Sequence, residues 1–150
     1  MKELTESEAF NRAAAYCSVA EHCSHEVSEK LRRWEVDAPV AQRILHRLIE
    51  EKYVDDLRYS RAFVRDKYRF AKWGKVKIAA ALHIKHIPGE VVQQALESID
   101  EEEYLDTLRD LLAAKQKSIR AANDYERKGK LIRFALGRGY EMHDIRKVGV

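Results

Sequence analysis

The sequence predicts an all-α protein in which three tandem three-helix repeats form an elongated, curved rod. Apolar residues recur at steps of three and four along the chain, which is the spacing of one helix face. No segment alternates apolar and polar residues between turn residues, as a surface strand does. The apolar pattern also repeats about every fifty residues, which is typical of stacked helical modules.

The three repeats are anchored by Val36, Ile87 and Tyr140, which are 51 and 53 residues apart. Apolar residues also match at nine and five positions before each anchor, and at five and eight positions after it. These matched sets are Val27, Ile78 and Leu131; Leu31, Leu82 and Ala135; Ala41, Val92 and Ile145; and Ile44, Ala95 and Val148. Four positions after the anchor the third repeat departs, because Asp144 stands where the first two repeats have valine. We expect domains at residues 1–54, 55–100 and 101–150.

Each repeat should contain a long first helix, a shorter second helix and a third helix after a sharp turn. The expected first helices are Glu6–Cys23, Asp56–Lys72 and Glu101–Lys117. The expected second helices are His25–Trp34, Lys75–Lys85 and Asp124–Leu136. The expected third helices are Ala38–Lys52, Pro88–Ile99 and Glu141–Lys147. Helix-capping motifs agree with these expected helix starts, since Thr5 with Glu8 fits a capping box and Asp100 with Glu103 resembles one. Further expected N-caps are Ser24, Asp37 and Asp55.

Composition narrows the class of protein. The chain has 150 residues, of which 45% are hydrophobic and 35% are charged, so we expect a folded and very soluble domain. No apolar run approaches the ~20 residues of a membrane span, and the N-terminal segment is acidic where a signal peptide is basic. We therefore expect a cytoplasmic protein without a membrane partner. Cys17 and Cys23 would face different sides of one shared helix, which argues against a disulfide.

Charge is unevenly distributed although the net charge is only +3. The net charges of residues 1–57, 58–77, 78–114 and 115–138 are −4, +7, −6 and +6 respectively. The first basic block, here called the basic strip, follows one predicted helix and enters the next. Its members are Arg58, Arg61, Arg65, Lys67, Arg69, Lys72, Lys75 and Lys77. Such a strip can contact phosphates or an acidic protein surface, and the alternative is a solvated helix face.

Aromatic residues accompany the basic strip. We expect Tyr59, Phe63 and Phe70 to lie in the core, whereas Trp73 fits either the core or a contact. A second basic block fits a binding surface and a solvated surface equally well. Its candidate contact residues are Lys115, Lys117, Arg127, Lys128, Lys130 and Arg133, with Arg120 and Arg138 beside them.

No catalytic or cofactor motif is present. The chain has no nucleotide-binding loop, no nucleophile elbow and no spaced carboxylate pair, so we expect a protein that is not an enzyme. The spacing of Cys17, His22, Cys23 and His25 matches no closed zinc site, so we expect no metal and no cofactor. Asp55 and Asp56 are interpreted as helix-capping residues.

Three stretches carry a resemblance to a known family. They are A-x-x-Y-C-S-x-A-E-H-C-S-x-E-V-x-x-K-L over 13–31, L-I-E-E-K-Y-V-D-D-L-R-Y-S-R-A-F-V-R over 48–65 and W-G-K-V-K-I-A-A-A-L-H-I-K-H-I over 73–87. Together they resemble the RecX family of recombinase regulators. Glu35, Lys52 and His86 stand where the family usually has glycine, and Ser60 where it has alanine. Glycine readily adopts the left-handed conformation that ends a helix. We therefore expect the corners at Glu35 and His86 to close differently from the R-G-Y corner at 138–140.

The resemblance implies tandem three-helix repeats and a regulatory function. It implies that the chain binds the RecA recombinase, mostly as its filament on single-stranded DNA. It also implies restraint of filament growth, ATP hydrolysis and strand exchange, and weak binding to single- and double-stranded DNA. We expect a monomer. The alternative is a weakly sequence-specific DNA-binding regulator, since three-helix modules with sharp corners are similar to helix-turn-helix units.

Overall fold

The computed structural model describes residues 3–150. Within that range the chain forms nine helices and no strand. The helices of the first module are α1 (Glu6–Val19), α2 (Ser24–Arg33) and α3 (Ala38–Glu50). Those of the second module are α4 (Asp56–Arg69), α5 (Lys75–Ile84) and α6 (Gly89–Glu97). Those of the third module are α7 (Glu101–Gln116), α8 (Asp124–Gly137) and α9 (Met142–Lys147).

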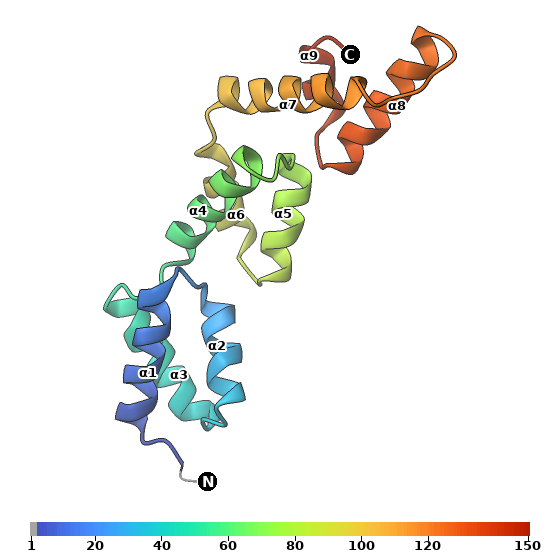
Figure 1. Cartoon of the computed structure of the whole chain (residues 1–150). Coiled ribbons are helices and arrows are strands. Elements are labelled where there is room, and N and C mark those ends of the chain that lie inside the picture. Colours follow the sequence, from blue (N-terminus) through green and yellow to red (C-terminus); the bar gives the residue numbers. More distant parts are fainter. Residues whose placement is uncertain (1–2) are drawn as a thin grey trace.

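The three modules follow one another in an elongated, curved rod (Figure 1). Module 1 lies at one end of the rod, and the loop between α7 and α8 projects at the other. The predicted all-α repeat architecture is thereby confirmed. Within residues 3–150 no helix is both long and apolar enough to cross a bilayer.

The first helix is shorter than predicted. It ends at Val19 rather than Cys23, because Cys23 adopts an extended conformation and is the N-cap of α2. The backbone N–H of Cys23 donates to Glu26 Oε1 at 3.1 Å, which completes a capping arrangement. The predicted N-cap at Ser24 is therefore wrong by one residue. Cys17 and Cys23 do not share a helix, and both thiols are free and buried.

The predicted start signals at Thr5, Asp55 and Asp100 agree with the structure, whereas Asp37 is the N-cap of α3 but its side chain makes no capping hydrogen bond. Thr5 and Glu8 form a full capping box at α1. The Asp55 side chain accepts from the Arg58 N–H at 3.0 Å, and Asp100 accepts from the Glu103 N–H at 3.1 Å. Short polar residues in these places satisfy N–H groups that have no partner inside the helix.

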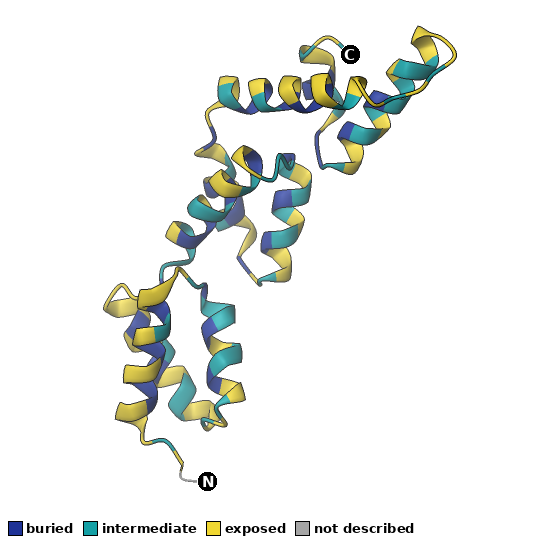
Figure 2. Cartoon of the chain, in the orientation of Figure 1, coloured by how far each residue is buried: buried dark blue, intermediate teal, exposed yellow. Residues whose placement is uncertain are grey.

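The matched apolar sets form the cores of the modules (Figure 2). Val27, Leu31, Ile78, Leu82 and Ala135 have no exposed surface. Module 1 has a core of its own, whereas modules 2 and 3 share one continuous core that Cys23 also joins. Modules 2 and 3 thus bury apolar surface together, and module 1 is attached as a more separate body.

The three corners close in the same way, so the expectation of different corners is wrong. In each corner the anchor N–H donates to the carbonyl five residues earlier, at 3.1–3.2 Å. Glu35 and His86 each have φ of 59°, and Gly139 has φ of 96°. The buried or half-buried anchor residue and its hydrogen bond hold the left-handed turn even without glycine. Such a residue costs roughly 1–2 kcal/mol of strain.

The joint between modules 2 and 3 is made by backbone contacts. The N–H groups of Gly74 and Val76 donate to the carbonyls of Arg138 and Gly139 at 2.7 and 3.0 Å. The Lys75 N–H donates to the hydroxyl of Tyr104 at 2.9 Å. The first N–H groups of α5 are therefore satisfied by module 3, which fixes the two modules relative to each other.

The joint between modules 1 and 2 is made by side chains. The Ser24 N–H donates to Asp56 Oδ1 at 2.8 Å. The rings of His25 and His86 stack with centroids 4.0 Å apart, and Lys85 Nζ lies 3.1 Å from Glu26 Oε2.

Candidate functional site

The structure divides the basic strip into residues that fasten the modules and residues that remain available. Arg58 pairs with Glu21 of module 1 at 2.8 Å. Arg69 pairs with Glu103, and Lys75 pairs with Glu101 at 2.9 Å, both across the joint with module 3. The hydrogen bond from Arg69 is the main reason that the pKa of Glu103 is lowered. These three cations are occupied by contacts within the chain.

Two further cations of the basic strip lie over Trp73. Lys67 Nζ is 4.6 Å from the indole centroid, and Lys77 Nζ is 4.5 Å from it. The indole itself is half-buried and packs against the shared core of modules 2 and 3. Trp73 is therefore both a core residue and the platform that orders two lysines.

A matching arrangement stands on the other side of the joint. Lys115 Nζ and Arg138 Cζ lie 4.8 and 5.2 Å from the ring centroid of Phe134. The two arrangements are neighbours, because the Arg138 carbonyl accepts from the N–H of Gly74, the residue after Trp73. We call Lys67, Lys77, Lys115 and Arg138 the joint cluster.

The joint cluster is positively charged and preorganised. Within residues 3–150 none of its four members forms an ion pair. An aromatic face attracts a cation without neutralising it, so the N–H donors remain free for an external anion. The arrangement suits phosphate or carboxylate groups on a partner.

The outer side of α4 carries a second available group. Arg61 and Arg65 are exposed and line a cavity of about 200 Å³ beside the start of module 3. Lys72 also lies nearby in sequence, and its carbonyl accepts from the hydroxyl of Tyr140 at 3.1 Å.

Phe70 is 80% exposed, so its predicted place in the core is wrong. The helix α4 ends at Arg69, and the next residue no longer follows the apolar face that buries Tyr59 and Tyr68. The sequence pattern therefore predicted burial for an aromatic side chain that is exposed in the structure. Its only signal in the sequence is its position between Arg69 and Lys72.

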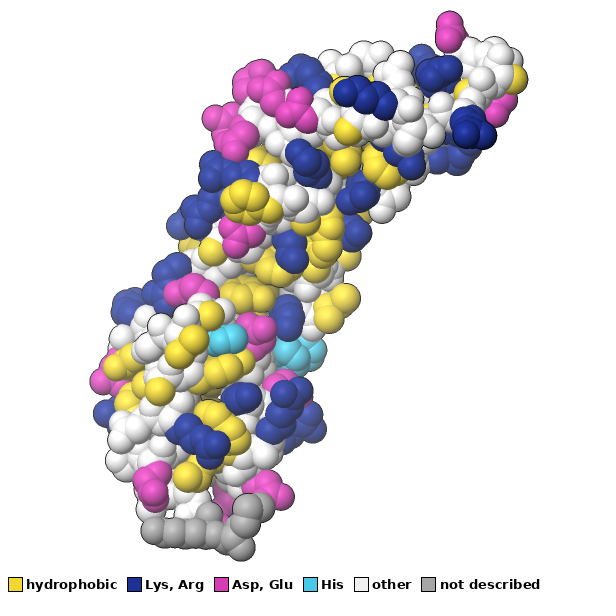
Figure 3. Space-filling view, in the orientation of Figure 1, with side chains coloured by type: hydrophobic (Ala, Val, Ile, Leu, Met, Phe, Trp, Pro, Cys, Tyr) yellow, Lys and Arg dark blue, Asp and Glu magenta, His cyan; other side chains and the backbone are white. Residues whose placement is uncertain are grey.

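The second basic block is less ordered by contacts. Lys130 Nζ lies 3.2 Å from Glu126 and donates to the Arg120 carbonyl at 2.6 Å. Within the described residues, no ion pair involves Lys117, Arg127, Lys128 or Arg133. Figure 3 shows Lys and Arg side chains along the middle of the rod and at the α8 end, whereas acidic side chains gather at the start of α7.

One group of possible metal ligands lies outside the residues that the sequence suggested. Glu141, His143 and Asp144 place their ligand atoms within 4.8 Å of one another, and no other such group lies in residues 3–150. Asp144 is 1% exposed, and neither carboxylate oxygen has a hydrogen-bond partner. The imidazole of His143 lies 3.3 Å from Asp144 and 3.7 Å from Glu141.

Comparisons with known proteins agree with the repeat architecture. Residues 9–48, 55–96 and 101–148 match the models of the first, second and third three-helix domains of RecX. The regulatory protein RecX of Prosthecochloris aestuarii is 30% identical over 148 residues, which cover 98% of this chain and 95% of the relative. That of Clostridium acetobutylicum is 30% identical over 144 residues, which cover 93% of this chain and 66% of the relative.

Solved structures show the same fold. The crystal structure of RecX from Lactobacillus salivarius has a TM-score of 0.85 at 21% identity and covers 95% of this chain and 93% of that one. Another crystal structure of a regulatory protein RecX has a TM-score of 0.87 at 19% identity and covers 95% and 70% of the two chains. With three matched domains in order and a relative similar over almost its whole length, the chain belongs to the RecX family of regulatory proteins.

Proposed function

We propose that this chain binds the RecA recombinase and its nucleoprotein filament, and restrains filament extension, ATP hydrolysis and strand exchange. It acts by binding and not by catalysis. Membership of a family of regulatory proteins supports a regulatory role. The joint cluster supports a polyanionic partner, because two cations that are unpaired within residues 3–150 lie over an aromatic ring on each side of the joint between modules 2 and 3.

The shape of the chain favours a polymer over a small ligand. A curved rod can lie along a helical filament and touch neighbouring recombinase subunits with different modules (Figure 1). Each module adds a contact at high effective concentration, so weak contacts combine into firm binding. A rod that bridges neighbours opposes the subunit movements of ATP turnover, and one at a growing end blocks extension.

We assign one contact to the end of α4 in module 2 and another to the joint between modules 2 and 3. The joint cluster meets DNA phosphates or acidic protein groups. Phe70, which is 80% exposed and directly follows Arg69 at the end of α4, supplies an apolar contact. Exposed aromatic residues beside arginines are typical of protein contacts. We therefore propose a protein contact at Phe70 and a polyanion contact at the joint cluster.

The test is the ATPase rate of RecA on single-stranded DNA with substoichiometric protein. We expect the wild type to slow hydrolysis and shorten filaments. The double variant Lys77→Gln/Arg138→Gln should need roughly tenfold more protein, because each phosphate contact contributes to affinity. The control is Arg146→Gln/Lys147→Gln, which removes the same two charge types outside the joint cluster and should act as wild type.

Unchanged hydrolysis and unchanged filament length at micromolar wild-type protein would refute the proposal. A footprint on one duplex sequence that persists at high salt would instead favour the DNA-binding regulator.

A further inference from the structure

The two ends of the rod carry surfaces of opposite charge. Within one chain they lie at opposite ends and cannot meet (Figure 1). Each surface also has an apolar part, so a contact between them would combine charge attraction with apolar burial.

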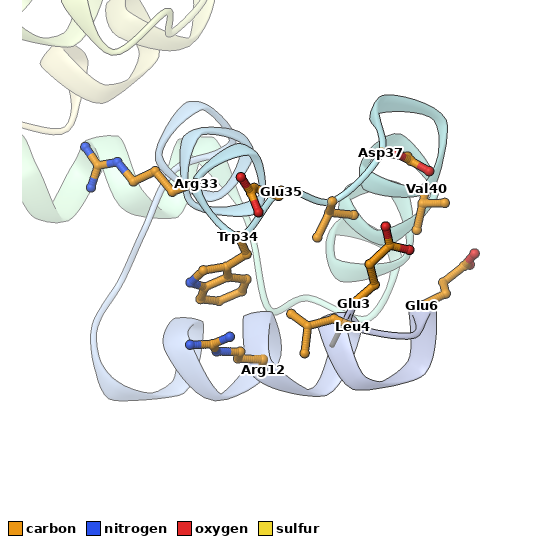
Figure 4. A pocket seen from close by; sticks show the side chains of 10 residues that line it. Glu3, Leu4, Glu6, Arg12, Arg33, Trp34, Glu35, Asp37 and Val40 are labelled. Carbon is orange, nitrogen blue, oxygen red and sulfur yellow. The ribbon is translucent and has the colours of Figure 1, made fainter. Parts of the chain in front are cut away.

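The first surface is a cavity of about 370 Å³ at the free end of module 1. Its apolar lining includes Leu4, Trp34, Val36 and Val40. Figure 4 shows the Trp34 indole facing Arg12, with Glu35 on the side of Trp34 away from Arg12 and Glu3 next to Leu4. We call this cavity the head pocket.

The free charge of the head pocket is negative. The lining also holds two arginines without an ion pair in the described part of the chain, which are fewer than its unpaired acids: Arg12 keeps its charge 4.5 Å from the centroid of the Trp34 ring, and Arg33 points away from the cavity in Figure 4. Glu6 forms an ion pair with Arg43 at 2.7 Å. Within residues 3–150 the remaining lining acids have no ion-pair partner; they are Glu3, Glu35 and Asp37.

The second surface lies on the first turns of α8, at the other end of the rod. Tyr125 is 89% exposed, the highest value among the large apolar and aromatic side chains described. Lys128 and Arg133 line a groove with Tyr125 and form no ion pair within residues 3–150. We call Tyr125, Lys128 and Arg133 the tail ridge.

We propose that the head pocket receives the tail ridge of a second copy of this chain. The Tyr125 ring would lie against the apolar lining while Lys128 and Arg133 meet Glu3, Glu35 and Asp37. The net charges of −4 for residues 1–57 and +6 for residues 115–138 favour the same pairing over long range.

The contact uses different surfaces on its two sides, so it continues from copy to copy as an open row. The exposed ion pairs are individually weak. Dilute protein therefore stays monomeric, and copies brought close together on a long polymer join end to end.

Sedimentation velocity of the purified full chain tests the proposal. We expect the wild-type sedimentation coefficient to rise between roughly 10 and 500 µM at low salt, and to stay constant at roughly 0.5 M salt because exposed charges are then screened. The head variant Glu35→Lys/Asp37→Lys and the tail variant Tyr125→Ala/Lys128→Glu should each remain monomeric. All four positions are exposed, and circular dichroism checks that both variants are folded.

Mixing the two variants gives the decisive result. The head variant keeps an intact tail and the tail variant keeps an intact head, so a mixture should form pairs and nothing longer. The control Glu90→Lys changes an exposed acid away from both surfaces and should associate as wild type. A wild type that is monomeric throughout, variants that associate as wild type, or a mixture without pairs would each overturn the proposal.

Discussion

Replacing Gly74 with alanine should separate modules 2 and 3. A Cβ at this position would overlap the backbone of Gly139 and Tyr140, which cannot move aside as a flexible side chain could. Separation would break the hydrogen bonds from the N–H groups of Gly74, Lys75 and Val76.

At about 1 kcal/mol for each bond, the loss is about 3 kcal/mol. For a chain of this size that lowers the unfolding midpoint by roughly 6–12 °C. Thermal unfolding followed by circular dichroism measures the shift. The variant should also weaken the proposed restraint of RecA, because the joint cluster is assembled from both modules.

The matched control is Gly137→Ala. A Cβ at Gly137 would meet no atom within 4 Å, and alanine is the better helix former by about 1 kcal/mol. The control should therefore be as stable as the wild type or more stable. If Gly74→Ala melts at the same temperature as Gly137→Ala, the joint is not the close backbone contact described above.

Three further predictions concern single residues. Glu35→Gly should raise the free energy of unfolding by about 1 kcal/mol, because glycine relieves the positive φ; a lower urea midpoint would contradict this. Ser60→Ala should also stabilise by about 1 kcal/mol, because the buried hydroxyl has no hydrogen-bond partner; equal or lower stability in the same titration would count against it. Burial raises the pKa of Cys23 to about 11, so the thiol stays protonated at pH 8 and native protein should alkylate slowly; modification as fast as in urea would disprove the burial.

The repeat could be predicted from the sequence because apolar spacing is a local property. Val27, Ile78 and Leu131 lie at matched positions, and all three are buried. The conformation of the corners was harder to predict. The local preference for glycine in a left-handed turn argued against such turns at Glu35 and His86, but the tertiary structure enforces them. The anchor residues Val36 and Ile87 hold their corners left-handed by hydrogen bonding and packing.

The available part of the basic strip could not be predicted, because it depends on partners distant in sequence. Arg58 and Arg69 find their acids 37 and 34 residues away. Lys77 becomes a neighbour of Arg138 only because Gly74 contacts the third corner. Helix spacing predicts that all these cations lie on one strip, but it does not predict which of them form ion pairs within the chain.

The central claim is that the joint cluster contacts the RecA filament. The most direct test measures how fast lysines are acetylated with and without the filament assembled on single-stranded DNA. Lys67, Lys77 and Lys115 should react at least several-fold more slowly when the filament is bound. Lys30 is the matched control, because it lies 5.2 Å from the Tyr16 ring in module 1 but outside the joint cluster. Protection of the three joint lysines with Lys30 unchanged is the predicted result. Equal rates with and without filament, or protection of Lys30 alone, would contradict the claim.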